Sequence, residues 1–164
     1  DKTGKPLGQT KERAAVHRDG DWLPSVHIWV VHENKILLQR RRQDKESFPG
    51  MLDLACTGHV DAGESYLQAA VRELKEELNL TAAETDFTEL FTQKLMVKED
   101  FGNGHFISNE INKVYLLHPA VPLNTLSYQK SEIDELVWVD KNASITSEFC
   151  IPQEEWSRAI KLIF

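Results

Sequence analysis

The stretch GHVDAGESYLQAAVRELKEELNL, Gly58–Leu80, joins a glycine-bearing loop to an amphipathic helix. Its apolar residues recur at spacings of three and four, which is the pattern of a helix with one face against a core. Beside that face, Glu73, Glu76 and Glu77 occupy an arc of roughly 100°. Like charges at this spacing repel each other, so the arc is either a solvated surface or a binding site for a cation.

The spacing of the residues in this stretch favours the cation site. It has the form G-x5-E-x7-R-E-L-x-E-E-x-N-L, which resembles the signature of the Nudix hydrolases. The matching residues are Gly58, Glu64, Arg72, Glu73, Leu74, Glu76, Glu77 and Leu80. Asn79 departs from the family, which has glycine there. Because Asn is the next-best residue after glycine for a left-handed C-cap, we expect the helix to end at this point all the same.

The glutamates of the helix are the expected metal ligands. Carboxylates at i, i+3 and i+4 converge on one patch, and a hard cation such as Mg²⁺ prefers oxygen ligands. We therefore expect Mg²⁺, or Mn²⁺ in its place, at Glu73, Glu76 and Glu77. Such a cation bridges diphosphate oxygens, neutralises their charge and helps to activate a water molecule.

The resemblance assigns roles to further residues of the signature. Arg72 is expected to orient a glutamate through a charge-assisted hydrogen bond, and it joins Glu76 as a candidate catalytic residue. Glu64 lies at the junction of loop and helix, where it would tie the loop down or lie close to the metal. Gly58 is included with Glu64 in the expected metal site.

Candidate substrate-binding residues lie outside the helix. Arg41 and Lys45, in the segment QRRRQDK, could each grip a phosphate group. Strand alternation places Arg41 opposite Arg40 and Arg42, so these arginines cannot all share one pocket. His59 follows the signature glycine directly and is expected at the edge of the site.

Downstream glutamates add candidates for the general base. Glu110 lies in SNEINKVYLL, and Glu132 lies in the loop QKSEIDEL before the last expected strand. The alternative for both is simple exposure, because most isolated glutamates lie at the surface. The tryptophans are expected in the core or at its rim, rather than as platforms on which a base stacks.

Hydrophobic patterning predicts a mixed sheet between helices. The expected strands cover 25–33, 35–42, 51–58, 86–99, 105–118 and 135–140. Residues 1–8 are expected to be a turn-rich entry to a hairpin, FGNG (101–104) a hairpin turn, and 151–164 a final helix with Pro152 in its first turn. Strands on both sides of a central helix predict an α/β (α+β) fold, which for a Nudix domain is an α/β/α sandwich.

Composition fits a single domain over residues 1–164, with 41% hydrophobic and 27% charged residues. The net charge of −7 provides no global basic field for nucleic acid or a membrane, so an anionic substrate needs local basic groups or a metal. Cys56 and Cys150 give no disulfide framework, and the sequence shows no signal peptide or membrane-spanning run. We therefore expect a cytoplasmic protein.

Segments outside the signature resemble the isopentenyl-diphosphate isomerase-like subgroup of the family. They are HRDGDW (17–22), HIWVV (27–31), LLQRR (37–41), GHVDAGES (58–65) and NEINKVYLL (109–117). True isomerases of this fold use a cysteine two residues before the histidine of the GH pair, and that position is Thr57 here. One of their metal-binding histidines falls on Leu23, whereas Glu110 matches one of their metal-binding glutamates. Cys56 is one residue off and is expected on the other face of its strand.

The complete acidic helix and the missing isomerase residues favour hydrolysis. The resemblance implies a Mg²⁺-dependent pyrophosphohydrolase that cleaves a nucleoside diphosphate linked to a moiety X, by attack of water on phosphorus. The alternatives are isopentenyl-diphosphate isomerisation and a nucleotide sensor without turnover, although a sensor does not need the full set of glutamates. The expected partner is a small-molecule diphosphate, and a homodimer remains an open alternative.

Overall fold

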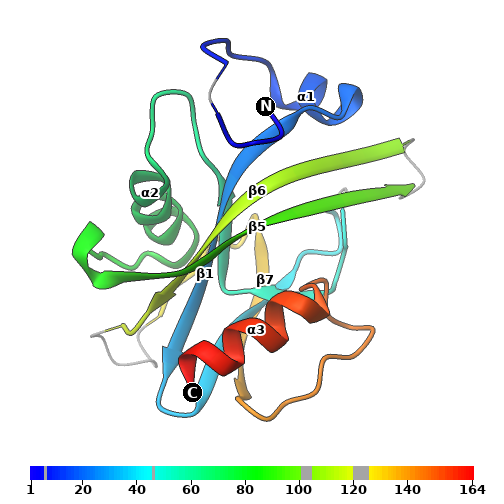
Figure 1. Cartoon of the computed structure of the whole chain (residues 1–164). Coiled ribbons are helices and arrows are strands. Elements are labelled where there is room, and N and C mark those ends of the chain that lie inside the picture. The colour runs from blue at the N-terminus through cyan, green and yellow to red at the C-terminus, as the bar shows by residue number, and fades with distance from the viewer. Residues whose placement is uncertain (6, 46, 101–104, 120–125) are drawn as a thin grey trace.

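The computed structural model describes residues 1–5, 7–45, 47–100, 105–119 and 126–164 (Figure 1). Its α-helices are α1 (Arg13–Asp19), α2 (Tyr66–Leu78) and α3 (Gln153–Ile163), with a short 3-10 helix at Glu84–Asp86. Its strands are β1 (Trp22–His32), β2 (Lys35–Arg41), β3 (Leu52–Leu54), β4 (Cys56–His59), β5 (Phe87–Asp100), β6 (His105–Leu117) and β7 (Ile133–Asp140). The FGNG turn lies outside the described residues.

The described strands form one seven-stranded mixed sheet. The main path runs β3-β2-β1-β6-β5, while β4 pairs with β1 and β7 pairs with β2. Strands β1 and β6 are parallel, and the other pairs are antiparallel. The central strand β1 therefore has β2 and β4 on one side and β6 on the other.

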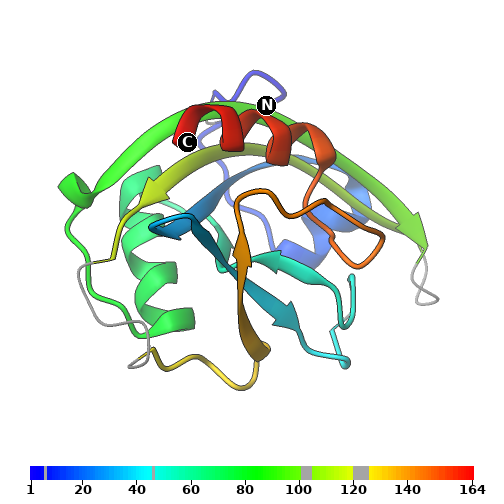
Figure 2. The ribbon, with the colours of Figure 1, turned by 90° about the horizontal axis from the view of Figure 1, so that it is seen from below.

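Helices cover the two faces of the sheet because side chains alternate along β1. Val26 and Ile28 belong to a buried cluster with Leu74 and other residues of α2. Trp29 belongs to a second cluster with Trp156 of α3, and their ring centroids lie 5.2 Å apart. Figure 2 shows the two helices on opposite sides of the strands. The predicted α/β/α sandwich with a mixed sheet is confirmed.

Both ends of α2 are fixed by local interactions. Ser65 accepts a hydrogen bond from the backbone N–H of Gln68, and the Gln68 side chain accepts one from Ser65 N–H, which forms a capping box. At the other end Asn79 adopts φ 51° and ψ 25°, as expected for a residue in the place of glycine. The start and the end of α2 are therefore fixed by local capping.

Two local expectations were wrong. The single strand predicted over 51–58 is two strands, because the chain changes neighbours at Ala55: β3 pairs with β2, whereas β4 pairs with β1. No helix was expected between residues 1–8 and the first strand, yet α1 forms there over seven residues, ahead of the β1–β2 hairpin. This helix has no buried residue and no side-chain cap, so no apolar period marked it in the sequence.

Among the described helices, none is long and apolar enough to cross a membrane.

Candidate active site

A cavity of about 720 Å³ lies where α1, β4, α2 and the 42–48 segment meet. All of the predicted site residues line it except Glu64, which lies behind Arg72. The lining members of that set are Arg41, Lys45, Gly58, His59, Arg72, Glu73, Glu76, Glu77, Glu110 and Glu132. Residues that lie up to 91 positions apart in the chain therefore border the same space.

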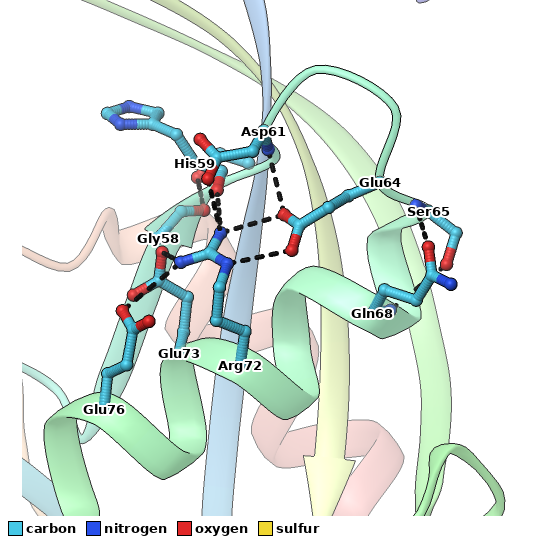
Figure 3. A network of polar contacts seen from close by, with 10 residues as sticks. Gly58, His59, Asp61, Glu64, Ser65, Gln68, Arg72, Glu73 and Glu76 are labelled. Atoms are coloured by element: carbon cyan, nitrogen blue, oxygen red, sulfur yellow. Dashed lines mark hydrogen bonds and ion pairs between the residues drawn. The ribbon is translucent and has the colours of Figure 1, made fainter.

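Arg72 connects the signature loop to the signature helix (Figure 3). Its Nε and Nη2 donate to the two carboxylate oxygens of Glu64 at 2.9 and 3.0 Å, and Nη2 also donates to the His59 carbonyl at 2.9 Å. Its Nη1 donates to Glu73 at 2.7 Å and makes a longer contact of 3.5 Å with Glu76. Hydrogen bonding to Glu64 raises the pKa of Arg72, and the same bonds lower the pKa of Glu64. The arginine thus orients its acidic neighbours, as the sequence predicted.

Glu73 and Glu77 are carboxylates in a poorly solvated position. Burial raises the pKa of Glu73 despite the adjacent Arg72. Burial, followed by the charges of Glu73 and Asp53, raises the pKa of Glu77 to about 8. A side chain at Gly58 would displace Glu73, since a Cβ there would lie 2.1 Å from Glu73 Cδ. Gly58 is therefore required for Glu73 to lie against β4.

These carboxylates fit a hard divalent cation. The Oε2 atom of Glu77 is buried and has no hydrogen-bond partner among the described residues, which a cation would supply. Within the described chain, no group of three His, Cys, Asp or Glu side chains is already arranged around one point. Here Glu73 and Glu76 contact Arg72 instead. Oxygen donors with one uncompensated buried atom suit Mg²⁺ or Mn²⁺ better than a soft metal.

Glu110 lies across the cavity from α2. Ser108 Oγ donates to its Oε1 at 2.6 Å, and His59 Nε2 lies 3.6 Å from the same atom. Burial opposes ionisation of Glu110, but the nearby His59 and the charge of His27 outweigh burial and lower its pKa to about 2. His17 of α1 completes this wall, with its ring centroid 5.8 Å from that of His59.

The predicted basic residues already have partners in the protein. Arg41 donates to the Ser47 carbonyl at 3.0 Å and lies 3.3 Å from Asp53, so it fixes the loop that it precedes. Lys45 forms an ion pair with Glu132. Arg40 pairs with Glu135, and neither Arg40 nor Arg42 lines the cavity, which confirms the alternation argument.

Several lining residues were missed by sequence reasoning. Lys11 and Arg13 reach the cavity only because α1 folds over it, and α1 was not predicted. Asp53 was not singled out because the strand boundary at Ala55 was misplaced. Strand alternation, counted from Gly58, could have assigned Asp53 to one face of the sheet. It could not have shown that Asp53 lies beside α2.

Cys56 and Thr57 point to opposite faces of their strand, as predicted. Thr57 lines the cavity, whereas Cys56 is fully buried in the cluster beneath α2. Burial raises the pKa of the Cys56 thiol well above its usual value, which is the opposite of what a nucleophile needs. Leu23, at the position of an isomerase histidine, also lines the cavity.

Comparison with known proteins identifies the family of the chain. The NUDIX domain model matches residues 21–158. The chain is 41% identical over 144 residues to Nudix hydrolase 3 of Arabidopsis thaliana, covering 84% of this chain but only 18% of that protein. It is 31% identical over 128 residues to an isopentenyl-diphosphate Delta-isomerase of Ruegeria pomeroyi, covering 78% of this chain and 68% of the relative.

A solved structure shares the fold. The crystal structure of DR0079 from Deinococcus radiodurans superposes with a TM-score of 0.64 at 21% identity, over 86% of this chain and 80% of that one. The matched domain spans the sheet, α2 with its intact acidic signature, and the first half of α3. The chain therefore belongs to the Nudix hydrolase family, whose members act on diphosphate bonds.

Proposed function

We propose that this protein is a pyrophosphohydrolase that uses Mg²⁺, or Mn²⁺ in its place, to cleave a nucleoside diphosphate linked to a second moiety. The observation that carries the proposal is the buried, unpaired Glu77 oxygen on the same cavity as Glu73 and Glu76. Burying carboxylates beside one another costs free energy that a purely structural helix would avoid. A cation-dependent function accounts for their retention.

The residues of the signature would have separate roles in this reaction. Glu73, Glu76 and Glu77, with Gly58 close by, would hold the cation. When bound, Mg²⁺ would neutralise the diphosphate and lower the pKa of water. Arg72 holds Glu73 toward the cavity through its 2.7 Å hydrogen bond, while Glu64 anchors Arg72 from behind.

Other lining residues would bind the substrate, and three glutamates are candidates to accept a proton. Lys45 and Arg41 lie where a phosphate can attract them, and His59 lies at the edge, close to Glu110. Candidate bases for the attacking water are Glu76, Glu110 and Glu132. Glu76 is the most accessible of the three, with 55% of its side chain exposed, whereas Glu132 is paired with Lys45.

The test is a hydrolysis screen over nucleoside diphosphates and triphosphates, nucleotide sugars, dinucleoside polyphosphates and ADP-ribose, with Mg²⁺ and with Mn²⁺. Release of phosphate or a nucleoside monophosphate from at least one substrate is expected. Glu76→Gln and Glu77→Gln should each lose about 100-fold or more in kcat at limiting Mg²⁺, as expected for a lost metal ligand or base. Glu84→Gln, an exposed change in the 3-10 helix, is the control and should retain full activity.

Retention of near-wild-type rates by both helix variants would show that α2 is not the metal site. No turnover of any substrate, together with tight nucleotide binding, would instead favour the sensor.

A further inference from the structure

All but one of the buried polar residues of the described chain lie on the α3 side of the sheet, and the exception is Gln39. They are Ser25, His27, Gln39, Ser108, Asn112 and Glu155, and all except Gln39 lie on or directly beneath the cavity. Buried polar groups are unfavourable unless they are satisfied, so their concentration at one place needs an explanation. This group lies between the apolar core under α3 and the open cavity.

An ion pair forms the centre of this group. His27 Nδ1 lies 2.9 Å from both carboxylate oxygens of Glu155, which is fully buried in the first turn of α3. Trp29 donates to Glu155 at 3.3 Å, and Gln93 donates to its other oxygen. The position near the helix N-terminus also favours a negative charge on Glu155. The carboxylate is therefore held ionised, and it requires a positive partner.

His27 supplies that partner. The charge of Glu155 raises the pKa of His27 in spite of burial, and His27 in turn lowers the pKa of Glu155. The Nε2 of His27 lies 3.0 Å from the amide of Asn112. A 180° rotation of this amide would offer its Oδ1, which has no partner among the described residues, to the second ring N–H.

Stability alone does not explain the pair. An apolar pair of similar volume between α3 and the sheet would be at least as stable as a buried ion pair. However, His27 also lines the cavity, so the positive end of the pair faces the site while the negative end lies beneath α3. A fixed dipole of this kind acts on charges in the cavity without reorganising.

Glu110, on the neighbouring strand β6, lines the same cavity as His27, and its charge acts on the imidazole. In the parallel register of β1 and β6, Leu23 is opposite Glu110, Ser25 is opposite Asn112 and His27 is opposite Val114. Glu110 and Asn112 are thus successive residues on the same face of β6, about 7 Å apart along the strand. Asn112, which contacts His27, lies beside Glu110 on that face.

We propose that His27 is a positioning residue for Glu110: anchored on Glu155 of α3, its imidazolium provides the fixed positive charge that holds the Glu110 carboxylate in the cavity. The inference rests on the proposed function in that Glu110 acts during hydrolysis. It makes α3, which lies outside the Nudix signature, part of the active-site machinery. The charged groups that act on His27 are Glu155 from α3, Glu110 from β6 and Asp53 from β3.

Histidine side-chain NMR tests the pair without requiring turnover. In the wild type, the His27 ring should remain an imidazolium well above the pH at which an ordinary histidine titrates. In Glu155→Gln, the ring should be neutral at pH 7.5. In Glu110→Gln, the pH midpoint of the His27 titration should fall measurably, because coupling between two charges is reciprocal. Glu154→Gln makes the same chemical change on the exposed neighbour and should leave His27 unaltered.

Kinetics provide the second measurement, on whichever substrate the wild type hydrolyses. Glu155→Gln should lower kcat about tenfold with little change in KM, a partial loss of the acid–base contribution. Glu154→Gln should keep both constants. A merely structural role would instead lower thermal stability and leave the kcat of the folded protein unchanged.

The proposal is overturned if Glu110→Gln leaves the His27 midpoint where it is, or if Glu155→Gln keeps the wild-type kcat. If the wild type hydrolyses nothing, the proposed function fails, and the NMR comparison still decides whether His27 acts on Glu110.

Discussion

The Glu77 carboxylate is buried against β4, close to Cys56 and Thr57, and its Oε2 accepts no hydrogen bond from the described residues. Without a cation, this charge destabilises the folded state, because its raised pKa means that ionisation favours unfolding. We predict that Glu77→Gln raises the melting temperature of the metal-free protein by about 2–4 °C, which corresponds to about 1 kcal/mol. Differential scanning calorimetry in EDTA at pH 8 would measure it. A lower melting temperature than wild type would mean that the carboxylate is well satisfied in the metal-free protein.

Asn79 is the one departure from the signature, and its side chain makes contacts that glycine cannot. It accepts from Lys75 at 2.7 Å and donates to Ser127 Oγ at 3.1 Å, next to the point where Gln129 N–H donates to the Glu77 carbonyl at 2.8 Å. We predict that Asn79→Gly preserves the helix, since glycine suits φ 51°, but increases hydrogen exchange in residues 126–132. Ser127→Ala should produce the same increase. Unchanged exchange in both variants would show that the amide does not hold this segment.

At the scale of elements, the sequence predicted the long periodic segments. It did not predict where the chain changes from one pairing strand to another. The sequence alone located α2, its C-cap at Asn79 and the α3 helix to within a few residues, because burial and capping leave local patterns. The division at Ala55 and the formation of α1 depend on which strand or loop lies opposite, and a single sequence does not show this. The same limit explains why Lys11, Arg13 and His27 were not predicted as site residues.

The stability contributed by the pair between His27 and Glu155 of α3 should depend on pH. The folded pKa of His27 is raised, so its stabilisation is fully present below pH 6.5 and is lost as the pH rises through the raised value. The folded pKa of Glu155 is lowered, so its stabilisation is present above pH 4.5 and is lost as the pH falls through the lowered value. We predict that the difference in the free energy of unfolding between wild type and Glu155→Gln is largest between these limits. Chemical denaturation from pH 3 to 10 would measure it, and a pH-independent difference would contradict a charged pair.

At the scale of the whole molecule, residues from separate segments meet in one cavity whose two walls have different chemistry. The α2 wall carries the buried glutamates, whereas the opposite wall carries Glu110, His59 and the β1 residues above α3. The signature alone predicted the first wall, because its residues are local in sequence. The second wall depends on the parallel pairing of β1 with β6, which joins residues 87 positions apart and carries no local signal.

The identity of the second wall also separates hydrolysis from isomerisation. Alkene protonation needs an acid and a base facing each other across a dry pocket, with the diphosphate left intact. Here Thr57 and Leu23 occupy the positions where an isomerase would have its cysteine and one histidine, and neither side chain transfers a proton at neutral pH. We therefore predict that incubation with isopentenyl diphosphate in heavy water incorporates no deuterium into an allylic product. Mass spectrometry of the recovered diphosphate, with a true isomerase as positive control, would measure it. Steady isomer formation together with no hydrolysis across the substrate screen would assign the protein to the isomerases, and the acidic helix would then need another explanation.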